Sequence, residues 1–274
     1  MDIEYNITYA DDSKYKLVYN TDKHSYMIGK DKVPSVTRVI DSCFPKYLVD
    51  WAVQEGADFF LQSLEPYRKP DPATFIIPQR VVEHIHQGIL TASKAISEHA
   101  ADVGSIVHSW ISEGIRWKLG YTHDPPEMPE DEEAINCVNA FKKWASTKSI
   151  TWLSTEEKVY YHSDNNIYRY AGTVDAVSSN IDGSPFVIDF KTSKKIYKPY
   201  YLQVAAYCRA IEKIRGIKPL GLILRLDKET GEFQEKIFDP QEHFAAFDLC
   251  LQLRKWSSTR IPKYDLSIRG PDKG

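Results

Sequence analysis

Residues 186–191 place charged side chains inside an apolar segment, and this pattern constrains the fold more than any other feature of the chain. The β-branched and aromatic residues of this run predict a β-strand. Because side chains alternate along a strand, Asp189 and Lys191 are expected on one face, with Ile188 and Phe190 on the opposite, buried face. A carboxylate in such surroundings is costly unless it is paired or binds a metal ion.

A second strand is predicted at residues 167–178, and the Asp-Gly and Pro signals of residues 179–185 predict a turn between the two strands. The resulting hairpin brings Asp175 beside Asp189 on one face. Two carboxylates and an ammonium group can hold a divalent cation and orient water for phosphodiester hydrolysis. The spacing alone equally allows a solvated ion pair between Asp189 and Lys191, with Asp175 capping a turn.

The segment that follows predicts a helix over residues 199–215, in which Gln203 and Tyr207 are four residues apart on one face. The apolar positions of this helix are available to pack on the sheet, so the polar pair can face the strand ends. These apolar positions are Leu202, Ala205, Ala206 and Ile211.

Three motifs in this order resemble the RecB-like branch of the PD-(D/E)XK nucleases: Gly-Thr-Val-Asp at 172–175, Asp-Phe-Lys-Thr at 189–192 and Gln-x-x-x-Tyr at 203–207. Residues 187–193 are especially similar to the mitochondrial genome maintenance exonuclease family and its phage relatives. Further upstream, residues 104–108 (Gly-Ser-Ile-Val-His) and 34–40 (Pro-Ser-Val-Thr-Arg-Val-Ile) match two other motifs of this group. The resemblance extends from about residue 24 to residue 258.

The resemblance implies an α/β fold: a PD-(D/E)XK restriction-endonuclease-like core, which is a central mixed sheet flanked by helices, with an N-terminal helical half arching over the active site. It also implies a metal-dependent DNA exonuclease that uses Mg²⁺ or Mn²⁺ and prefers single-stranded ends, in replication, recombination or repair. A structure-specific endonuclease and a non-catalytic nucleic-acid-binding subunit are the alternatives.

The same resemblance assigns roles to individual residues. His108, Asp175 and Asp189 are the expected metal ligands, with the backbone carbonyl of Phe190 as a further one. Without the motif, a lone histidine on an apolar helix face would be interpreted as a packed core residue. Lys191 is expected to orient or activate water, and Gln203 and Tyr207 to support the lysine and the bound phosphate. An acidic residue on the first core strand is also expected, from Glu156 or Glu157, and the spacing to a following valine favours Glu156.

Charge is distributed unevenly along the chain. The total net charge is −3, but residues 186–218 contain eight basic and two acidic residues. This excess lies beside the predicted site and is interleaved with tyrosines, a pattern typical of a phosphate-binding track, although a solvated helix face is the alternative. The residues predicted to contact DNA are Lys194, Lys195, Lys198, Tyr200 and Arg209.

The predicted organisation is one catalytic unit with three parts: a β-hairpin and helical part at 1–148, the nuclease core at 149–258 and a basic tail at 259–274. A hairpin is expected near residues 14–28, a helix capped by Ser35, a helix containing Trp51, a loop at 66–78 and helical pieces at 80–117 and 130–147. Core strands are expected at 150–161, 167–178, 185–191, 220–226 and 233–238, and a last helix at 240–257.

Four cysteines without C-x-x-C spacing predict reduced, packed thiols and no iron–sulfur cluster. No signal, transit or membrane-spanning segment is visible, so we expect no membrane partner and a cytoplasmic protein, bacterial or phage-encoded by family likeness. Recombination or replication proteins are its expected protein partners.

Overall fold

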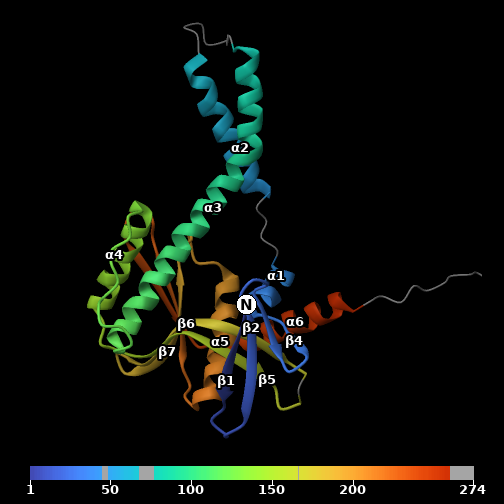
Figure 1. Cartoon of the computed structure of the whole chain (residues 1–274), viewed down its shortest axis with the longest axis vertical. Coiled ribbons are helices and arrows are strands. Elements are labelled where there is room, and N and C mark those ends of the chain that lie inside the picture. The colour runs from blue at the N-terminus through green and yellow to red at the C-terminus, as the bar shows by residue number, and fades with distance from the viewer. Residues whose placement is uncertain (45–48, 68–76, 166, 260–274) are drawn as a thin grey trace, which may run out of the picture.

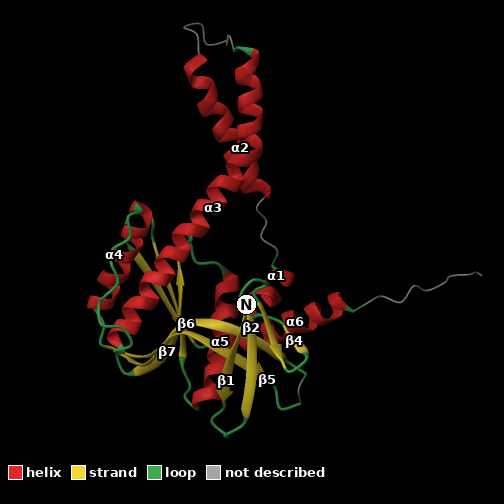
Figure 2. Ribbon diagram, viewed as in Figure 1, coloured by secondary structure: helices red, strands yellow, loops and turns green. Residues whose placement is uncertain are grey.

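The computed structural model describes residues 1–44, 49–67, 77–165 and 167–259 (Figure 1). It is an α/β arrangement in which a mixed five-stranded sheet is covered by helices on both faces (Figure 2). The sheet has the order β5-β6-β7-β8-β9. Its strands are β5 (Ile150–His162), β6 (Arg169–Ile181), β7 (Ser184–Lys191), β8 (Leu220–Leu226) and β9 (Phe233–Phe238).

All neighbouring strands of this sheet run antiparallel except β7 and β8, which are parallel. A parallel pair needs a crossover connection. Helix α5 (Lys198–Arg215) provides it, and its buried face packs on the sheet with α6 (Gln241–Ser258) and α1 (Val36–Cys43). The Ser35 hydroxyl caps α1 by accepting a hydrogen bond from the Arg38 backbone N–H, which confirms that prediction.

The opposite face of the sheet is covered by α4 (Glu132–Ser146) and by the C-terminal half of α3 (Gln79–Lys118). Alternation along β7 divides its residues between the two cores as predicted: Ile188 and Phe190 pack with α3 and α4, whereas Val187 packs with α5. Asp189 therefore faces the α5 side.

The N-terminal region forms a second sheet rather than the expected single hairpin. The predicted pair β2 (Lys14–Asn20) and β3 (Ser25–Ile28) is confirmed, but β1 (Asp2–Thr8) and β4 (Asp31–Val33) extend it to four strands in the order β1-β2-β3-β4. Its apolar face packs on Tyr160 and Ala171 of the central sheet. This contact places the small sheet beside β5 and β6.

Helix α3 is one continuous helix of 40 residues, which confirms the helical piece predicted at residues 80–117. Its N-terminal half pairs with α2 (Val49–Leu64), the helix that contains Trp51, and together they form an arm that projects away from both sheets (Figure 1). Close packing within the arm needs glycine, because a Cβ on Gly88 would lie 2.1 Å from the ring of Phe59.

Most other elements agree with the predicted ranges to within one to three residues. The predicted loop at 66–78 contains the end of the short helix η1 (Glu65–Tyr67), and its residues 68–76 lie outside the described part of the chain. The tail at 259–274 lies almost entirely outside it as well. Among the described helices, none is both long and apolar enough to cross a membrane.

Candidate metal centre

The candidate site begins where β6 and β7 separate. Regular pairing of these strands includes Ala176 with Ile188, and Asp175 and Asp189 occupy the next position. There the Asp175 side chain replaces a backbone partner: its Oδ2 accepts a hydrogen bond from the Phe190 backbone N–H at 2.9 Å. The hairpin prediction is thus confirmed, but the two carboxylates have different partners.

Glu156 stands opposite Asp175 on β5, between the pairs Thr155 with Ala176 and Glu157 with Val174. Its φ is +50°, a left-handed conformation that is uncommon for a residue other than glycine. The strand thereby loses its regular alternation at this residue, and the Glu156 carboxylate reaches Asp175. Its pKa is raised, first by partial burial and then by the Asp175 charge.

Glu157, the alternative acidic residue, faces another group of side chains. Its carboxylate accepts a hydrogen bond from Arg215 at 2.7 Å and a short one from the Ser154 hydroxyl. The structure therefore places Glu156, and not Glu157, beside Asp175.

His108 reaches the site from α3, on the far side of the sheet from α5. One turn earlier on this helix, a Cβ on Gly104 would lie 3.4 Å from the Thr192 hydroxyl, so the helix passes close to the end of β7. His108 Nδ1 lies 3.4 Å from Asp175 Oδ2. Burial lowers the pKa of the imidazole, but Asp175 more than offsets this and raises it overall.

His108, Glu156 and Asp175 each offer a ligand atom, and these atoms all lie within 4.8 Å of one another. Burial raises the pKa of Asp175, yet His108, Lys191 and the Phe190 N–H together hold it below its usual value, so the carboxylate is ionised. Two carboxylates and one imidazole suit Mn²⁺, and the oxygen ligands suit Mg²⁺. The donor set therefore fits a divalent cation.

Asp189 lies outside this group of three, although it was expected to be a metal ligand. Its Oδ2 lies 2.7 Å from Lys191 Nζ, and its Oδ1 accepts a hydrogen bond from Gln203 Nε2 at 2.9 Å. Burial raises its pKa to about 6 although Lys191 acts in the other direction. The role expected for the Phe190 carbonyl stays a prediction.

Lys191 is held on three sides. Its ammonium donates to Gln203 Oε1 at 3.3 Å, pairs with Asp189 and lies 4.8 Å from the centre of the Tyr200 ring. Burial opposes its charge, but Asp189 and Asp175 raise its pKa, so it remains an ammonium group. The chain Lys191–Gln203–Asp189 fixes the lysine at the edge of the metal group.

Tyr207 is buried against β6, one turn after Gln203 on α5. A Cβ on Gly172 would lie 2.6 Å from the Tyr207 ring, which gives the glycine of the Gly-Thr-Val-Asp motif a packing reason. Burial, followed by the charges of Asp189 and Asp175, raises the pKa of Tyr207 well above its usual value. Its hydroxyl therefore stays protonated.

Residues 192–197 form a loop before α5, and together with Lys198, the first residue of that helix, they are called the basic loop here. Its exposed lysines are Lys194, Lys195 and Lys198. Arg225 on β8 positions this loop by donating from Nε to the Ser193 carbonyl at 2.7 Å. Arg209 does not belong to the same surface: it pairs with Asp248 on α6 and lies over the ring of Tyr161. Its guanidinium is therefore already neutralised inside the fold.

Lys158 is a site residue that the sequence interpretation omitted. It follows Glu156 by two residues on β5, and its Nζ lies 3.9 Å from Glu156 Oε2. The same i, i+2 spacing that identified Asp189 and Lys191 was present here, but two adjacent glutamates obscured which face it occupied.

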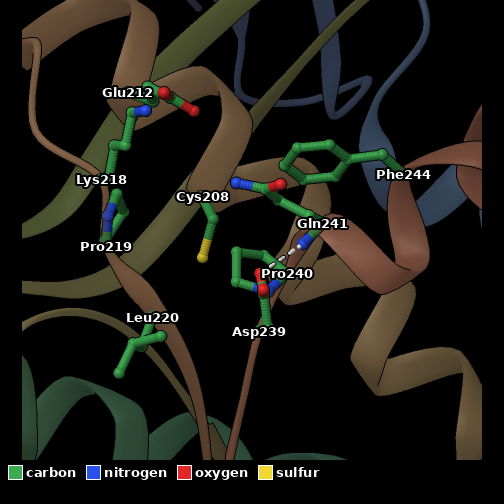
Figure 3. A pocket seen from close by; sticks show the side chains of 9 residues that line it. All are labelled: Cys208, Glu212, Lys218, Pro219, Leu220, Asp239, Pro240, Gln241 and Phe244. Carbon is green, nitrogen blue, oxygen red and sulfur yellow. Dashed lines mark hydrogen bonds between the residues drawn. The ribbon is translucent and has the colours of Figure 1, made fainter.

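A separate pocket lies between the C-terminal half of α5 and the start of α6 (Figure 3). Cys208 forms part of its wall, and burial raises the pKa of this thiol well above its usual value, so the thiol is protonated. Glu212 and Lys218 also line it, and none of the predicted site residues does. The four cysteines, Cys43, Cys137, Cys208 and Cys250, are free thiols, as predicted.

Comparison with known proteins gives limited information. No family model and no curated protein matches the chain. Among solved structures, a protein designated SSO0001 is 14% identical, with 74% of this chain and 86% of that chain covered and a TM-score of 0.34. A structure named "Putative exonuclease" from Eubacterium rectale is also 14% identical, with 58% and 69% covered and a TM-score of 0.40. At these scores, neither likeness assigns an activity to this chain.

Proposed function

We propose that this protein is a metal-dependent nuclease that hydrolyses phosphodiester bonds in DNA, with a PD-(D/E)XK core of the RecB-like branch. The observation that carries the proposal is the meeting of His108, Glu156 and Asp175 from three different elements within 4.8 Å, beside a buried ion pair of Asp189 and Lys191. Structural ion pairs rarely need an imidazole, a left-handed glutamate and a half-buried aspartate at one point.

The proposed chemistry assigns a distinct task to each group. His108, Glu156 and Asp175 would hold Mg²⁺ or Mn²⁺, which supplies charge neutralisation for the phosphate and lowers the pKa of bound water. Lys191 orients the attacking water and stabilises the developing negative charge. Gln203 bridges Lys191 and Asp189, and so keeps the ammonium in position.

The substrate is proposed to be DNA with a free, single-stranded end. The basic loop presents three exposed lysines next to Lys191, and backbone phosphates are the anions that such a surface attracts. Tyr200 on α5 contacts Lys191, and its ring centre lies 5.6 Å from that of Tyr197, so the loop and the start of α5 also carry rings on which a base can stack. The same core could cut within a strand, so preference for ends is the first property to test. Recombination or replication proteins remain its proposed partners.

The test is a cleavage assay with 5′- and 3′-labelled single-stranded, double-stranded and circular DNA in Mg²⁺, Mn²⁺ or EDTA. Glu156→Gln and Glu157→Gln form a matched pair, because adjacent glutamates undergo the same substitution and only Glu156 faces Asp175. We expect metal-dependent shortening of linear DNA that Glu156→Gln and Lys191→Ala abolish and Glu157→Gln retains. Cleavage of circles would indicate an endonuclease, and wild-type protein inactive on all substrates would refute the proposal.

A further inference from the structure

Lys158 carries a mostly buried ammonium group beside the candidate metal centre. Its side chain is only 14% exposed, and its sole ionic partner among the described residues is Glu156, at 3.9 Å. Within that part of the chain, no hydrogen bond is made by its ammonium, since an ion pair of this length is longer than a hydrogen bond. A buried ammonium with so little compensation is costly.

The N-terminal sheet holds this lysine in place. The Lys158 ammonium lies 5.4 Å from the ring centre of Tyr19 on β2 and 5.9 Å from that of Tyr5 on β1. Tyr19 is itself fixed by a hydrogen bond of 2.9 Å between its hydroxyl and His24 Nδ1. Aromatic faces attract cations, so the two rings direct the ammonium toward Glu156.

Metal binding would change the charges that surround Lys158. Without metal, three carboxylates (Glu156, Asp175 and Asp189) face two lysines (Lys158 and Lys191) and the His108 imidazole. A divalent cation on Glu156 and Asp175 would add positive charge, and Lys158 would then share with the cation its only anionic partner among the described residues. An anion that binds beside the metal would then relieve this unbalanced charge.

We propose that Lys158, positioned by Tyr5 and Tyr19, binds a backbone phosphate of the nucleic-acid strand adjacent to the phosphate at the metal centre. The inference rests on the proposed nuclease function, and it gives the N-terminal sheet a part in substrate binding. Lys158 lies on the Glu156 side of the metal group, whereas Lys191 ends β7 and the basic loop follows it, so the nucleic-acid strand would be bound from two sides.

The test separates binding from cleavage. Anisotropy titrations use a fluorescent, phosphorothioate-linked oligothymidine, which keeps the backbone charge and resists hydrolysis, in Mn²⁺ at several salt concentrations. The variants are Lys158→Met, which keeps the stem and removes the charge, and Lys158→Arg, which keeps a cation. Lys32→Met, on the exposed strand β4, is the matched control. Binding of Mn²⁺ alone is measured on each variant by calorimetry.

We expect Lys158→Met to weaken oligonucleotide binding about tenfold, as for one charge-assisted hydrogen bond, and to reduce the salt slope by about 0.7, as for one lost phosphate contact. Lys158→Arg should restore most of the affinity, and Lys32→Met should behave as wild type. Mn²⁺ affinity should be unchanged or higher in Lys158→Met, because Glu156 loses a competing cation.

Two results would overturn the inference: wild-type affinity and salt slope in Lys158→Met, or a parallel loss of Mn²⁺ affinity, which would show that the lysine only positions Glu156. Wild-type protein that binds no oligonucleotide would also overturn it. Binding that depends on Lys158 without any cleavage of ordinary DNA would instead refute the proposed hydrolysis and leave the phosphate subsite standing.

Discussion

The left-handed conformation of Glu156 predicts that this residue, which lies at the candidate metal centre, lowers the stability of the fold. A non-glycine residue in this region costs about 1–2 kcal/mol. Glycine avoids that cost, although its larger freedom in the unfolded chain costs about 0.5–1 kcal/mol. Glu156→Gly should therefore be more stable than Glu156→Gln by about 1 kcal/mol in EDTA, since both variants lack the charge.

The charge itself should matter little to the stability of the metal-free protein. Repulsion by Asp175 and attraction by Lys158 act over similar distances with opposite sign, and both are screened because 45% of the Glu156 side chain is exposed. The stability difference between the two variants consequently reports the backbone conformation.

Thermal unfolding provides the assay. A difference of about 1 kcal/mol corresponds to roughly 2–4 °C in a domain of this size. Mn²⁺ at about 100 times its dissociation constant should stabilise the wild type by about 2.7 kcal/mol. Both Glu156 variants should lose most of that shift, whereas Glu157→Gln should keep it. If Glu156→Gly melts below Glu156→Gln in EDTA, or if either variant keeps the full Mn²⁺ shift, the reasoning is refuted.

Three further predictions concern neighbouring residues. Burial raises the pKa of Asp189 to about 6 in the folded state, above its usual value of 3.8. Protonation of Asp189 therefore stabilises the folded protein fully below pH 3.8, and this stabilisation is lost as the pH rises through 6. Relative to Asp189→Asn, the wild type should lose up to about 3 kcal/mol over this range in urea titrations in EDTA; parallel curves would contradict it. Gly172→Ala should lower the free energy of unfolding by about 1–3 kcal/mol and reduce cleavage, because the new Cβ displaces Tyr207. The control is Gly114→Ala, whose Cβ meets nothing closer than 3.8 Å, and it should be neutral or stabilising in the same unfolding and activity assays. Alanine at all three lysines of the basic loop should reduce the salt slope of single-strand binding by about 2; an unchanged slope would exclude the loop from the DNA path.

Alternating and helical patterns predicted the central sheet and the helices α5 and α6, because their buried faces are long and regular. Only β2 and β3 of the N-terminal sheet were predicted. Strand β1 contains Asp2, Glu4 and Asn6 between its apolar residues, and it is stabilised by pairing with β2, which its composition does not indicate. The helical pattern of residues 80–117 predicted helix α3 to within one residue at each end. Within this helix, Gly88 permits the close approach of Phe59.

At the site, motif and spacing brought Asp175, Asp189, Lys191 and Gln203 to one place. Strand alternation could not choose between Glu156 and Glu157, since the choice depends on a φ of +50° that no residue pattern encodes. Charge counting included Arg209 in the DNA-binding track because its partner, Asp248, is 39 residues away in the sequence. Local charge density does not reveal such a distant counter-ion.

Helix α3 continues without interruption from the arm to the candidate metal centre, although its axis changes direction between the two (Figure 1). A helix of 40 residues extends about 60 Å, and His108 lies on it near Asp175 while its other end pairs with α2 in the arm. A movement of the arm that α3 transmits to His108 would change the distance between the imidazole and the two carboxylates. Thermodynamic linkage is reciprocal, so a strand that shifted the arm in this way would alter metal affinity by the same factor by which metal alters the affinity for that strand. A cation held only by β5 and β6 would lack this connection to the arm, which one unbroken helix provides.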